Sequence, residues 1–378
     1  MSSPVIALSV PDLGPAEAAA AAASVDVVRG GKVDLGAIEQ FERGIAEVTG
    51  CRYAVALSSG TAALHLALIH LGARPGTVVL TSSMTFAATA NAIRYTGAEP
   101  VFVDSQASDA NVNPHLLLNA ADQLLAQGRE IAAAVPVDLY GRCADYSVLE
   151  PGLRERGIPL LCDAAESLGA AHNGRPAGSF GEAGVFSFNV NKLLTTLGGG
   201  MLVSDDEDLV AHARKLATQA RENVPWYEHT ELGFNYRMTH TSAAIGNAQL
   251  ARLPELLAAR RAIRDGYAGH FADVPSVRIL GRDAGDGGDN CWLTSIVVND
   301  PTFDAAAAVA ALQAEGIEAR QLWKPMHLQP VYADATVVGG ELAEDLFARG
   351  LNLPSSSVLT DSELDRVVER LTRWLDAQ

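Results

Sequence analysis

The sequence predicts an α/β protein in which a large, mostly parallel sheet of seven strands is followed by a smaller C-terminal α/β domain. Short apolar strands alternate with helices from about residue 53 to about residue 205, and this alternation is typical of parallel sheets covered by helices on both faces. After about residue 208, helices and irregular segments predominate. A chain of 378 residues is long enough for two domains, each with a core.

The elements of the alternating region follow from short apolar runs separated by turns and longer helical patterns. Strands are expected at 53–57, 78–81, 100–103, 132–137, 159–163, 184–188 and 201–204. Helices are expected at 60–71, 87–95, 114–127 and 148–156. A turn over 193–200 separates the last two strands.

The second half of the chain has a different character. We expect a helix, an irregular aromatic segment, a long helix and a Gly/Asp-rich loop at 207–220, 225–238, 241–271 and 281–290. Strands at 292–298 and 318–322 then alternate with helices at 303–315, 340–348 and 361–376. The predicted large domain covers residues 25–250 and the small domain covers 251–378. The N-terminal helix within residues 1–24 is expected to belong with the small domain.

Composition excludes some partners. The net charge of −17 argues against nucleic acid or an anionic membrane, because both require a basic face. The four cysteines are far apart and lack metal-site spacing, so we expect reduced thiols, no metal and a cytoplasmic location. Neither a signal peptide nor an apolar stretch long enough to span a bilayer is expected.

A strand, a turn of small residues and a helix follow one another in "AVALSSGTAALHLALIHLG" (54–72). Ser58, Ser59, Gly60 and Thr61 lie where the helix begins, and the free N–H groups of a helix start can hold a phosphate. Simple capping by a serine or threonine is the common alternative. The glycine patterns of P-loop proteins and of dinucleotide-binding dehydrogenases are absent.

Asp163 ends an apolar strand in "PLLCDAAESLGA" (159–170). In an open α/β sheet this end of a strand faces the ligand crevice. A carboxylate there can cap the next helix, which is the commoner case, or it can hold a protonated ring nitrogen. Glu166 can complete a capping box or contact a ligand.

Lys192 is the single lysine of "FSFNVNKLLTTLGGGMLVSDD" (186–206). A lysine at such a bend can be solvated, or its amine can act as a nucleophile in a dry pocket. The phosphate turn, Asp163 and Lys192 together match the needs of pyridoxal phosphate: a phosphate cradle, an anion beside the ring nitrogen and an amine for the aldehyde. We therefore predict this cofactor.

Six blocks of the sequence resemble the DegT/DnrJ/EryC1/StrS family of nucleotide-sugar aminotransferases, and they follow the order found in that family. The resemblance runs from about residue 25 to the C-terminus and implies the aspartate-aminotransferase fold (fold type I). The blocks are "SSGTAALHLAL", "TFAATANAI" (85–93), "VPVDLYGRCADY" (135–146), "DAAESLGA" (163–170), "FSFNVNKLLTT" (186–196) and "GFNYRMTHTSAAIGNAQLARL" (233–253).

The resemblance implies a role for each residue around the cofactor. Lys192 is expected to bind the aldehyde covalently and to carry the proton between the cofactor and the substrate carbon. Asp163 is expected to pair with the ring nitrogen, Phe86 to stack on the ring and Glu166 to lie beside it. The phosphate is expected to be held by Ser59, Gly60, Thr61, Ser187 and, from the neighbouring subunit, Asn235. This arrangement implies a homodimer with shared sites.

Two positions depart from the family pattern. Relatives often have S-F-H-x-x-K, whereas position 189 is Asn here, and many have T-T-G-E-G-G, whereas this chain has "TTLGGG" (195–200). Neither departure affects Lys192, so amino transfer is still expected. In the sugar-dehydratase branch of the family a histidine replaces the lysine, and Lys192 argues against that branch.

The predicted reaction moves an amino group from L-glutamate or glutamine to a keto sugar of a nucleoside diphosphate. The segment "LWKPMHLQPVY" (322–332) resembles relatives that aminate C4, so we expect C4 of a 4-keto-6-deoxyhexose on UDP or dTDP. A 3-keto sugar substrate and a non-catalytic protein that binds the cofactor are the alternatives. Candidate substrate contacts are Arg29, Lys32, Asn189, Arg237, Lys324 and His327, the last of which could instead pack the loop.

Overall fold

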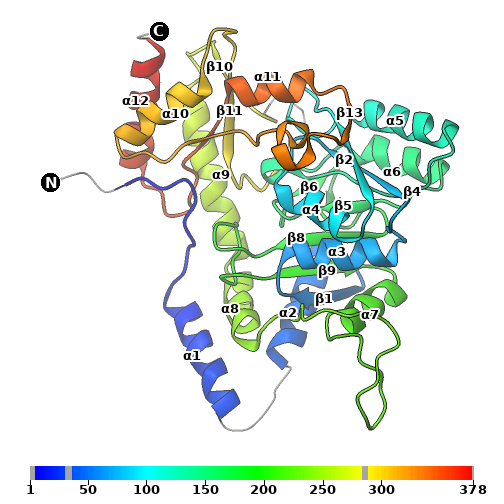
Figure 1. Ribbon diagram of the computed structural model, residues 1–378. Helices are drawn as coiled ribbons and strands as arrows, with labels where there is room; N and C mark the ends of the chain where they lie inside the picture. The colour runs from blue at the N-terminus through cyan, green and yellow to red at the C-terminus, as the bar shows by residue number, and fades with distance from the viewer. Residues whose placement is uncertain (1–4, 30–35, 283–287, 377–378) are drawn as a thin grey trace.

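The structure is a computed structural model that describes residues 5–29, 36–282 and 288–376 (Figure 1). Its main sheet consists of two groups of four strands, in the orders β13-β3-β2-β4 and β5-β8-β9-β1. Parallel bridges Ala134↔Leu160 and Val137↔Asp163 join β4 to β5. The strands are β1 (Tyr53–Leu57), β2 (Val78–Ser82), β3 (Glu99–Val103), β4 (Ile131–Val135), β5 (Leu161–Asp163), β8 (Ala183–Ser187), β9 (Gly200–Ser204) and β13 (Thr336–Val338).

The predicted seven strands are therefore confirmed, and the sheet is mostly parallel. Only β9 runs against its neighbours, since it pairs antiparallel with both β1 and β8. The sequence reasoning missed β13, a strand from the C-terminal part of the chain that adds to the edge of the sheet beside β3. Two short strands, β6 (Ala171–His172) and β7 (Arg175–Pro176), form a separate hairpin.

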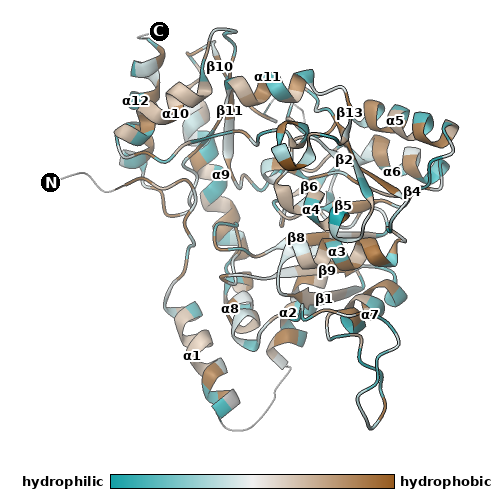
Figure 2. Cartoon of the chain, in the orientation of Figure 1, coloured by the Kyte–Doolittle hydropathy of each residue, from teal (hydrophilic) through white to brown (hydrophobic). Residues whose placement is uncertain are grey.

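Helices cover both faces of this sheet because successive strand residues point to opposite sides. Val79 packs into a core with α3 (Gly60–His70) and α7 (Glu207–Leu216), whereas Leu80 packs into the core of α5 (Pro114–Ala126) and α6 (Tyr146–Glu155). Helix α3 is buried along most of its length, and it is among the most hydrophobic helices in Figure 2. The start of α3 is thus held firmly beside α4 (Ala87–Tyr95) and the strand ends.

The C-terminal region has its own antiparallel sheet, in the order β10-β11-β14-β12. Its strands are β10 (Val277–Ile279), β11 (Thr294–Val298), β14 (Gly350–Leu353) and β12 (Arg320–Gln321). The helices near it are α9 (Leu253–His270), α10 (Ala305–Ala314), α11 (Glu341–Arg349) and α12 (Asp361–Leu375). The division of the chain at residue 250 stays a prediction.

The N-terminal segment reaches both regions. Ile6 forms a bridge with Ile317 of the C-terminal region and lies in its core. Helix α1 (Pro15–Arg29) instead packs against α8 (His240–Ala251), at the lower left of Figure 1. Helix α2 (Gly36–Thr49), which the sequence reasoning did not predict, also packs against α8.

The long helix predicted over 241–271 is two helices in the structure. Helix α8 ends at Ala251 and α9 begins at Leu253, so Arg252 lies between them. Pro254 is the reason: proline has no N–H to donate and its ring clashes with the preceding turn, but it is well tolerated in the first turn of a new helix.

Across the described residues, every helix is too short or too polar to cross a membrane. All four cysteines are free thiols.

A buried carboxylate, Asp138, lies just after strand β4. Asp138 accepts hydrogen bonds from Tyr146 Oη (2.7 Å), Ser167 Oγ (2.7 Å) and Ala144 N (2.9 Å). Burial nevertheless raises the pKa of Asp138 from 3.8 to about 6. The folded chain therefore holds this proton more tightly than the unfolded chain does, and this contribution to stability is lost as the pH rises from about 4 to about 6.

We expect Asp138→Asn to remove that pH dependence. Relative to the variant, the wild type should lose about 3 kcal/mol of unfolding free energy between pH 3 and pH 7, since each pKa unit corresponds to about 1.4 kcal/mol. Urea unfolding of both proteins across this range measures the difference. A difference that stays constant with pH would show that Asp138 does not titrate in this window.

Candidate functional site

A cavity of about 320 Å³ opens at the carboxyl ends of the parallel strands, beside the start of α3. This is the edge of an α/β sheet at which ligands bind. Nine of the predicted site residues line the cavity: Ser59, Gly60, Thr61, Phe86, Asp163, Glu166, Ser187, Asn189 and Lys192. These nine residues come from four separate segments of the chain and meet in one place.

The turn at the start of α3 leaves room for a phosphate. Ser59 caps the helix, because its Oγ accepts from Ala62 N (3.0 Å). The first amides of the helix, those of Gly60 and Thr61, have no partner within the helix. A Cβ on Gly200 would lie 2.4 Å from Gly60 N, so a side chain on this strand would fill the space at the turn. Capping and phosphate binding are therefore compatible here.

Asp163 is held rigidly at the floor of the cavity. Its Oδ2 accepts from Thr89 Oγ1 at 2.6 Å, and its Oδ1 accepts from Ala165 N at 3.2 Å. Burial raises the pKa of Asp163, while the Thr89 hydrogen bond and the Lys192 charge act in the opposite direction. No helix follows Asp163 directly, so its carboxylate serves a turn and the cavity, and it is not the cap of a long helix.

Glu166 connects the lysine to a strained loop. Its Oε1 lies 3.4 Å from Lys192 Nζ, and its Oε2 accepts from Tyr140 N at 2.8 Å. Burial raises the pKa of Glu166, and the nearby Lys192 charge lowers it. Tyr140 lies within the 3-10 helix η1 (Leu139–Gly141) at φ 56°, a conformation that is unfavourable for a residue with a side chain. The capping box considered for Glu166 is not formed.

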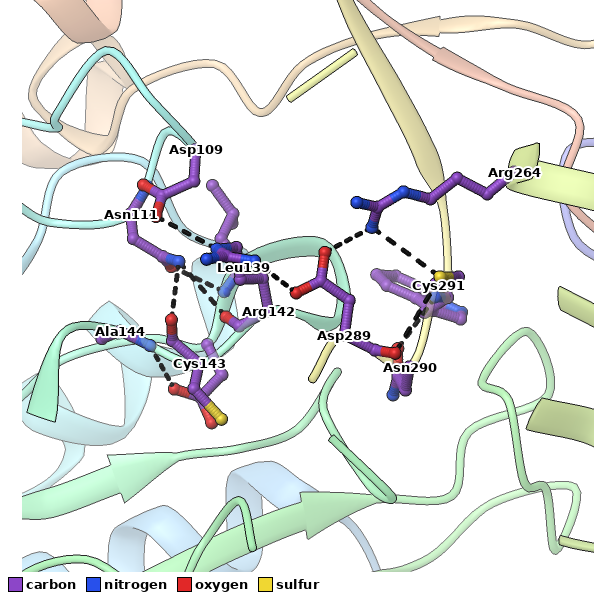
Figure 3. Close-up of polar contacts among 12 residues, drawn as sticks. Asp109, Asn111, Leu139, Arg142, Cys143, Ala144, Arg264, Asp289, Asn290 and Cys291 are labelled. Atoms are coloured by element: carbon purple, nitrogen blue, oxygen red, sulfur yellow. Dashed lines mark hydrogen bonds and ion pairs between the residues drawn. The ribbon is translucent and has the colours of Figure 1, made fainter. Parts of the chain in front are cut away.

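A buried ionic network holds that loop in place. Figure 3 shows the Asp289 carboxylate between Arg142 and Arg264, with Arg142 Nη1 at 2.7 Å from Asp289 Oδ1. Arg142 Nε also lies 3.4 Å from Asp109 Oδ2. The adjacent Asn290 donates to the carbonyls of Glu166 (2.8 Å) and Leu168 (3.0 Å). The network thus ties the η1 loop and the Glu166 segment to helix α9.

Aromatic side chains form the other walls of the cavity. Phe86 precedes α4 and is 59% exposed, so its ring face is available for stacking. The centroid of the Trp323 ring lies 5.8 Å from that of Phe86 and 5.7 Å from that of Tyr140. Tyr140 Oη also accepts a hydrogen bond from Trp323 N at 2.7 Å. Trp292 also lines the cavity, and its ring face contacts the Lys192 amine.

Sequence reasoning missed several of these residues as site components. They are Thr89, Tyr140, Asn191, Trp292 and Trp323. "TFAATANAI" and "VPVDLYGRCADY" were recognised as blocks, but nothing in them indicated which side chains point inward. Trp292 could have been suspected only as a large aromatic residue at the start of the predicted strand 292–298.

Three predicted substrate residues, and the predicted phosphate contact Asn235, do not line the cavity of their own chain. Arg29 is exposed at the end of α1 and pairs with Asp26 (3.5 Å). Lys324 is exposed next to Trp323. Asn235 and Arg237 are exposed, although the intervening Tyr236 O accepts from Ser58 N at 2.7 Å, beside the phosphate turn. Lys32 lies outside the described residues.

His327 does not line the cavity either, and the substrate contact expected of it stays a prediction. Its Nδ1 lies 2.6 Å from Ser83 Oγ, and its Nε2 lies 3.0 Å from Glu344 Oε1. Both ring nitrogens are therefore engaged within the chain. This geometry matches the alternative of loop packing, in which His327, within η2 (Met326–Leu328), anchors the segment that carries Trp323.

The arrangement fits pyridoxal phosphate. The glycine turn offers amides without a side chain in the way, Asp163 offers a buried carboxylate, Phe86 offers an exposed ring face and Lys192 offers an amine. Each group is of the type that one part of the cofactor requires. An amine that is largely shielded from solvent and lies beside a buried carboxylate can act both as a nucleophile and as a proton carrier.

Comparisons with known proteins agree with this geometry. Residues 16–372 match the model of the DegT/DnrJ/EryC1/StrS aminotransferase family. The chain is 42% identical to EpsN of Bacillus subtilis over 338 residues, which are 88% of this chain and 87% of EpsN. It is 36% identical to GDP-perosamine synthase of Caulobacter vibrioides, over 89% of this chain and 90% of that protein. The structure of DesI in the presence of its TDP-sugar product is similar, with a TM-score of 0.87 and 30% identity, covering 100% of this chain and 96% of that one.

Proposed function

The chain belongs to the DegT/DnrJ/EryC1/StrS family and is a pyridoxal-phosphate-dependent sugar aminotransferase; from this premise we propose that its acceptor is C4 of a nucleotide-linked 4-keto-6-deoxyhexose. The proposed amino donor is L-glutamate or glutamine. The meeting of Lys192, Asp163 and the phosphate turn in one cavity supports the amino transfer. The resemblance of the segment 322–332 to relatives that aminate C4 supports the position on the sugar. A cavity with both Lys192 and Asp163 in place also argues against a non-catalytic role.

The cofactor, when bound, supplies the electron sink, and the residues of the chain hold and orient the reacting groups. Asp163 would keep a positive charge on the ring nitrogen by lying beside it. Phe86 would fix the plane of the ring, and the amides of Gly60 and Thr61 would hold the phosphate. Lys192 would take and return a proton at the substrate carbon, with Glu166 close to its Nζ.

The sugar side of the site is proposed to be formed by the 322–332 segment. Trp323 lines the cavity and gives an aromatic surface to the sugar ring, and Asn189 lies at the rim. Lys324 and Arg237 are exposed outside the cavity, where they could meet the diphosphate without entering the reaction centre. One relative is named for a GDP sugar and another was solved with a TDP-sugar product, which supports a nucleotide-linked acceptor without choosing the nucleotide.

A panel of 4-keto and 3-keto sugars on UDP, dTDP and GDP, each offered with L-glutamate, tests this proposal. We expect a product in which amine replaces the keto oxygen for a 4-keto sugar, detected by mass spectrometry and placed at C4 by NMR. The keto carbon must lie about 3–3.5 Å from the reacting amine, so a 3-keto sugar would need a different position of the whole ring. A 3-amino product would overturn C4, and cofactor binding without amination of any sugar would favour the non-catalytic alternative.

We also propose a homodimer in which each site includes residues of both subunits. The segment around 221–236 projects from the body below α7 (Figure 1), and it exposes Trp226 (60%), Tyr227 (81%) and Leu232 (90%). Asn235 lies in the same segment and is itself exposed. Large apolar side chains exposed together in this way are typical of a surface that a second subunit covers. The cytoplasmic location also stays a prediction.

Mixing two inactive variants tests the shared site. If Lys192 and Asn235 in one site come from different chains, then in a heterodimer of Lys192→Ala with Asn235→Ala one site carries both lesions and the other carries none. We expect activity to return to roughly a quarter of the wild-type level, since half of the dimers are mixed and half of their sites are intact. Native mass spectrometry confirms subunit exchange. Complete exchange without recovery would show that both residues come from one chain.

A further inference from the structure

The amine of Lys192 lies between two groups of different chemistry. Its Nζ is 3.8 Å from the centroid of the Trp292 ring and 3.4 Å from Glu166 Oε1. Only 13% of the lysine side chain is exposed. A lysine has four flexible torsions, and holding it in one position costs conformational entropy. The electron-rich face of an indole attracts an ammonium group and can offset that cost.

Each polar atom of Trp292 forms a hydrogen bond. Its side chain is 1% exposed, and its Nε1 donates to Asn191 O at 2.8 Å, next to the lysine in the chain. Its backbone N donates to Asn290 Oδ1 at 2.8 Å. Its carbonyl accepts from the buried Arg260 at 2.8 Å. The indole face is therefore a fixed surface, set by contacts with the lysine turn and with helix α9.

An aminotransferase must release its lysine in each cycle and then recover it. In the released state the amine has to stay near the reacting carbon, because a proton carrier works only within hydrogen-bonding reach. The contact with Glu166 limits the position of the amine from one side, and a second contact is needed to fix it. We propose that the indole face of Trp292 is the resting position of the Lys192 amine whenever it is not bonded to the cofactor, which makes Trp292 a positioning residue of the reaction.

The proposal separates the indole face from the indole N–H. Trp292→Phe keeps an aromatic face but cannot donate to Asn191 O, whereas Trp292→Leu and Trp292→Met keep neither. Trp374→Phe is the matched control, because Trp374 packs against Phe303 in the C-terminal core (5.4 Å) and is not among the residues that line the cavity. Far-ultraviolet circular dichroism and thermal unfolding establish which variants are folded; Trp292→Met replaces Trp292→Leu if the latter is not.

The first measurement uses cofactor-free protein. Pyridoxal phosphate is added, borohydride stops the reaction at set times, and mass spectrometry gives the fraction of chains that carry cofactor on the Lys192 peptide. We expect capture by Trp292→Leu or Trp292→Met to be roughly tenfold slower than by the wild type, because the side chain is no longer held at the cavity, where the ammonium can pass its proton to Glu166 before the neutral amine attacks the aldehyde. Trp292→Phe should stay within about threefold of the wild type, and Trp374→Phe should match it.

The second measurement is turnover with a sugar acceptor that the wild type uses. We expect kcat to fall by a similar factor in the non-aromatic variants, with KM for both substrates unchanged, since Trp292 acts on the lysine and not on substrate binding. Wild-type capture rates in all variants would overturn the proposal. Equal slowing in Trp292→Phe and Trp292→Leu would also overturn it, because the bond to Asn191 O would then account for the effect. The capture measurement needs no sugar, so it stands even if the C4 assignment fails.

Discussion

Replacing Lys192 with alanine should abolish turnover and prevent borohydride from attaching the cofactor to the chain. Two functions are lost together: the amine that bonds the cofactor aldehyde, and the base that moves the substrate proton. Loss of general acid–base catalysis alone costs up to roughly 10⁴-fold in rate, and loss of the covalent attachment adds to this. The variant can still bind the cofactor, because the phosphate turn and Asp163 are intact.

Two features of the chain make this result easy to read. The sequence contains only four lysines, Lys32, Lys192, Lys215 and Lys324, so mass spectrometry of the reduced protein identifies the site without ambiguity. Lys215 is paired with Glu222 and Glu231 (2.8 Å each) on the surface, and Lys215→Ala is the control that should keep full activity. Lys192→Arg keeps a positive charge between Glu166 and Trp292 but lacks a primary amine, so it should be as inactive as the alanine variant.

The assignment would be wrong if a cofactor adduct persisted on another lysine in Lys192→Ala. Substantial turnover by Lys192→Arg would show that only the charge matters, which would exclude nucleophilic attachment through this residue.

Asp163→Asn should lower turnover by roughly 10²-fold or more, the scale of removing an electrostatic partner of a reacting group. We propose that the buried carboxylate keeps the ring nitrogen of the cofactor protonated, and an amide carries no charge. Asparagine has nearly the same shape and can still accept from Thr89 Oγ1, which now donates to Asp163 at 2.6 Å. The loss should therefore appear in kcat for both substrates, with little change in stability.

Asp138→Asn is the matched control for that variant. Both aspartates are buried, and Asp138 N donates to Asp163 O at 3.0 Å, but Asp138 is not among the residues that line the cavity. If removal of any buried carboxylate near this strand impaired the enzyme, the two variants would lose activity alike. Near wild-type activity in Asp163→Asn would mean that its carboxylate only stabilises the turn to Ala165.

Local pattern was sufficient to predict much of this protein. The strands and helices between residues 53 and 204 follow from short apolar runs and helical periodicity, and the phosphate turn, Asp163 and Lys192 follow from residue type and position at strand ends. These features are readable because each depends on neighbours close in sequence: a helix start needs only its first residues, and a strand needs only its own alternation.

Where local sequence signals compete or are weak, the secondary structure predicted from sequence was less complete. The break at Arg252 depends on Pro254, which a continuous helical pattern on both sides obscured. The reversed direction of β9 has no signature within the strand, because the same apolar residues suit either direction.

The fine geometry of the site was decided by tertiary structure alone. Trp292 contacts the lysine turn across 101 residues of sequence, and Trp323 contacts Tyr140 across 183. The same long-range packing gave both nitrogens of His327 partners and so removed it from the cavity. Sequence determines which side chains can bond, bind charge or stack. Which of them point into one cavity depends on the packing of the strands and helices that carry them, and that packing is a property of the whole fold.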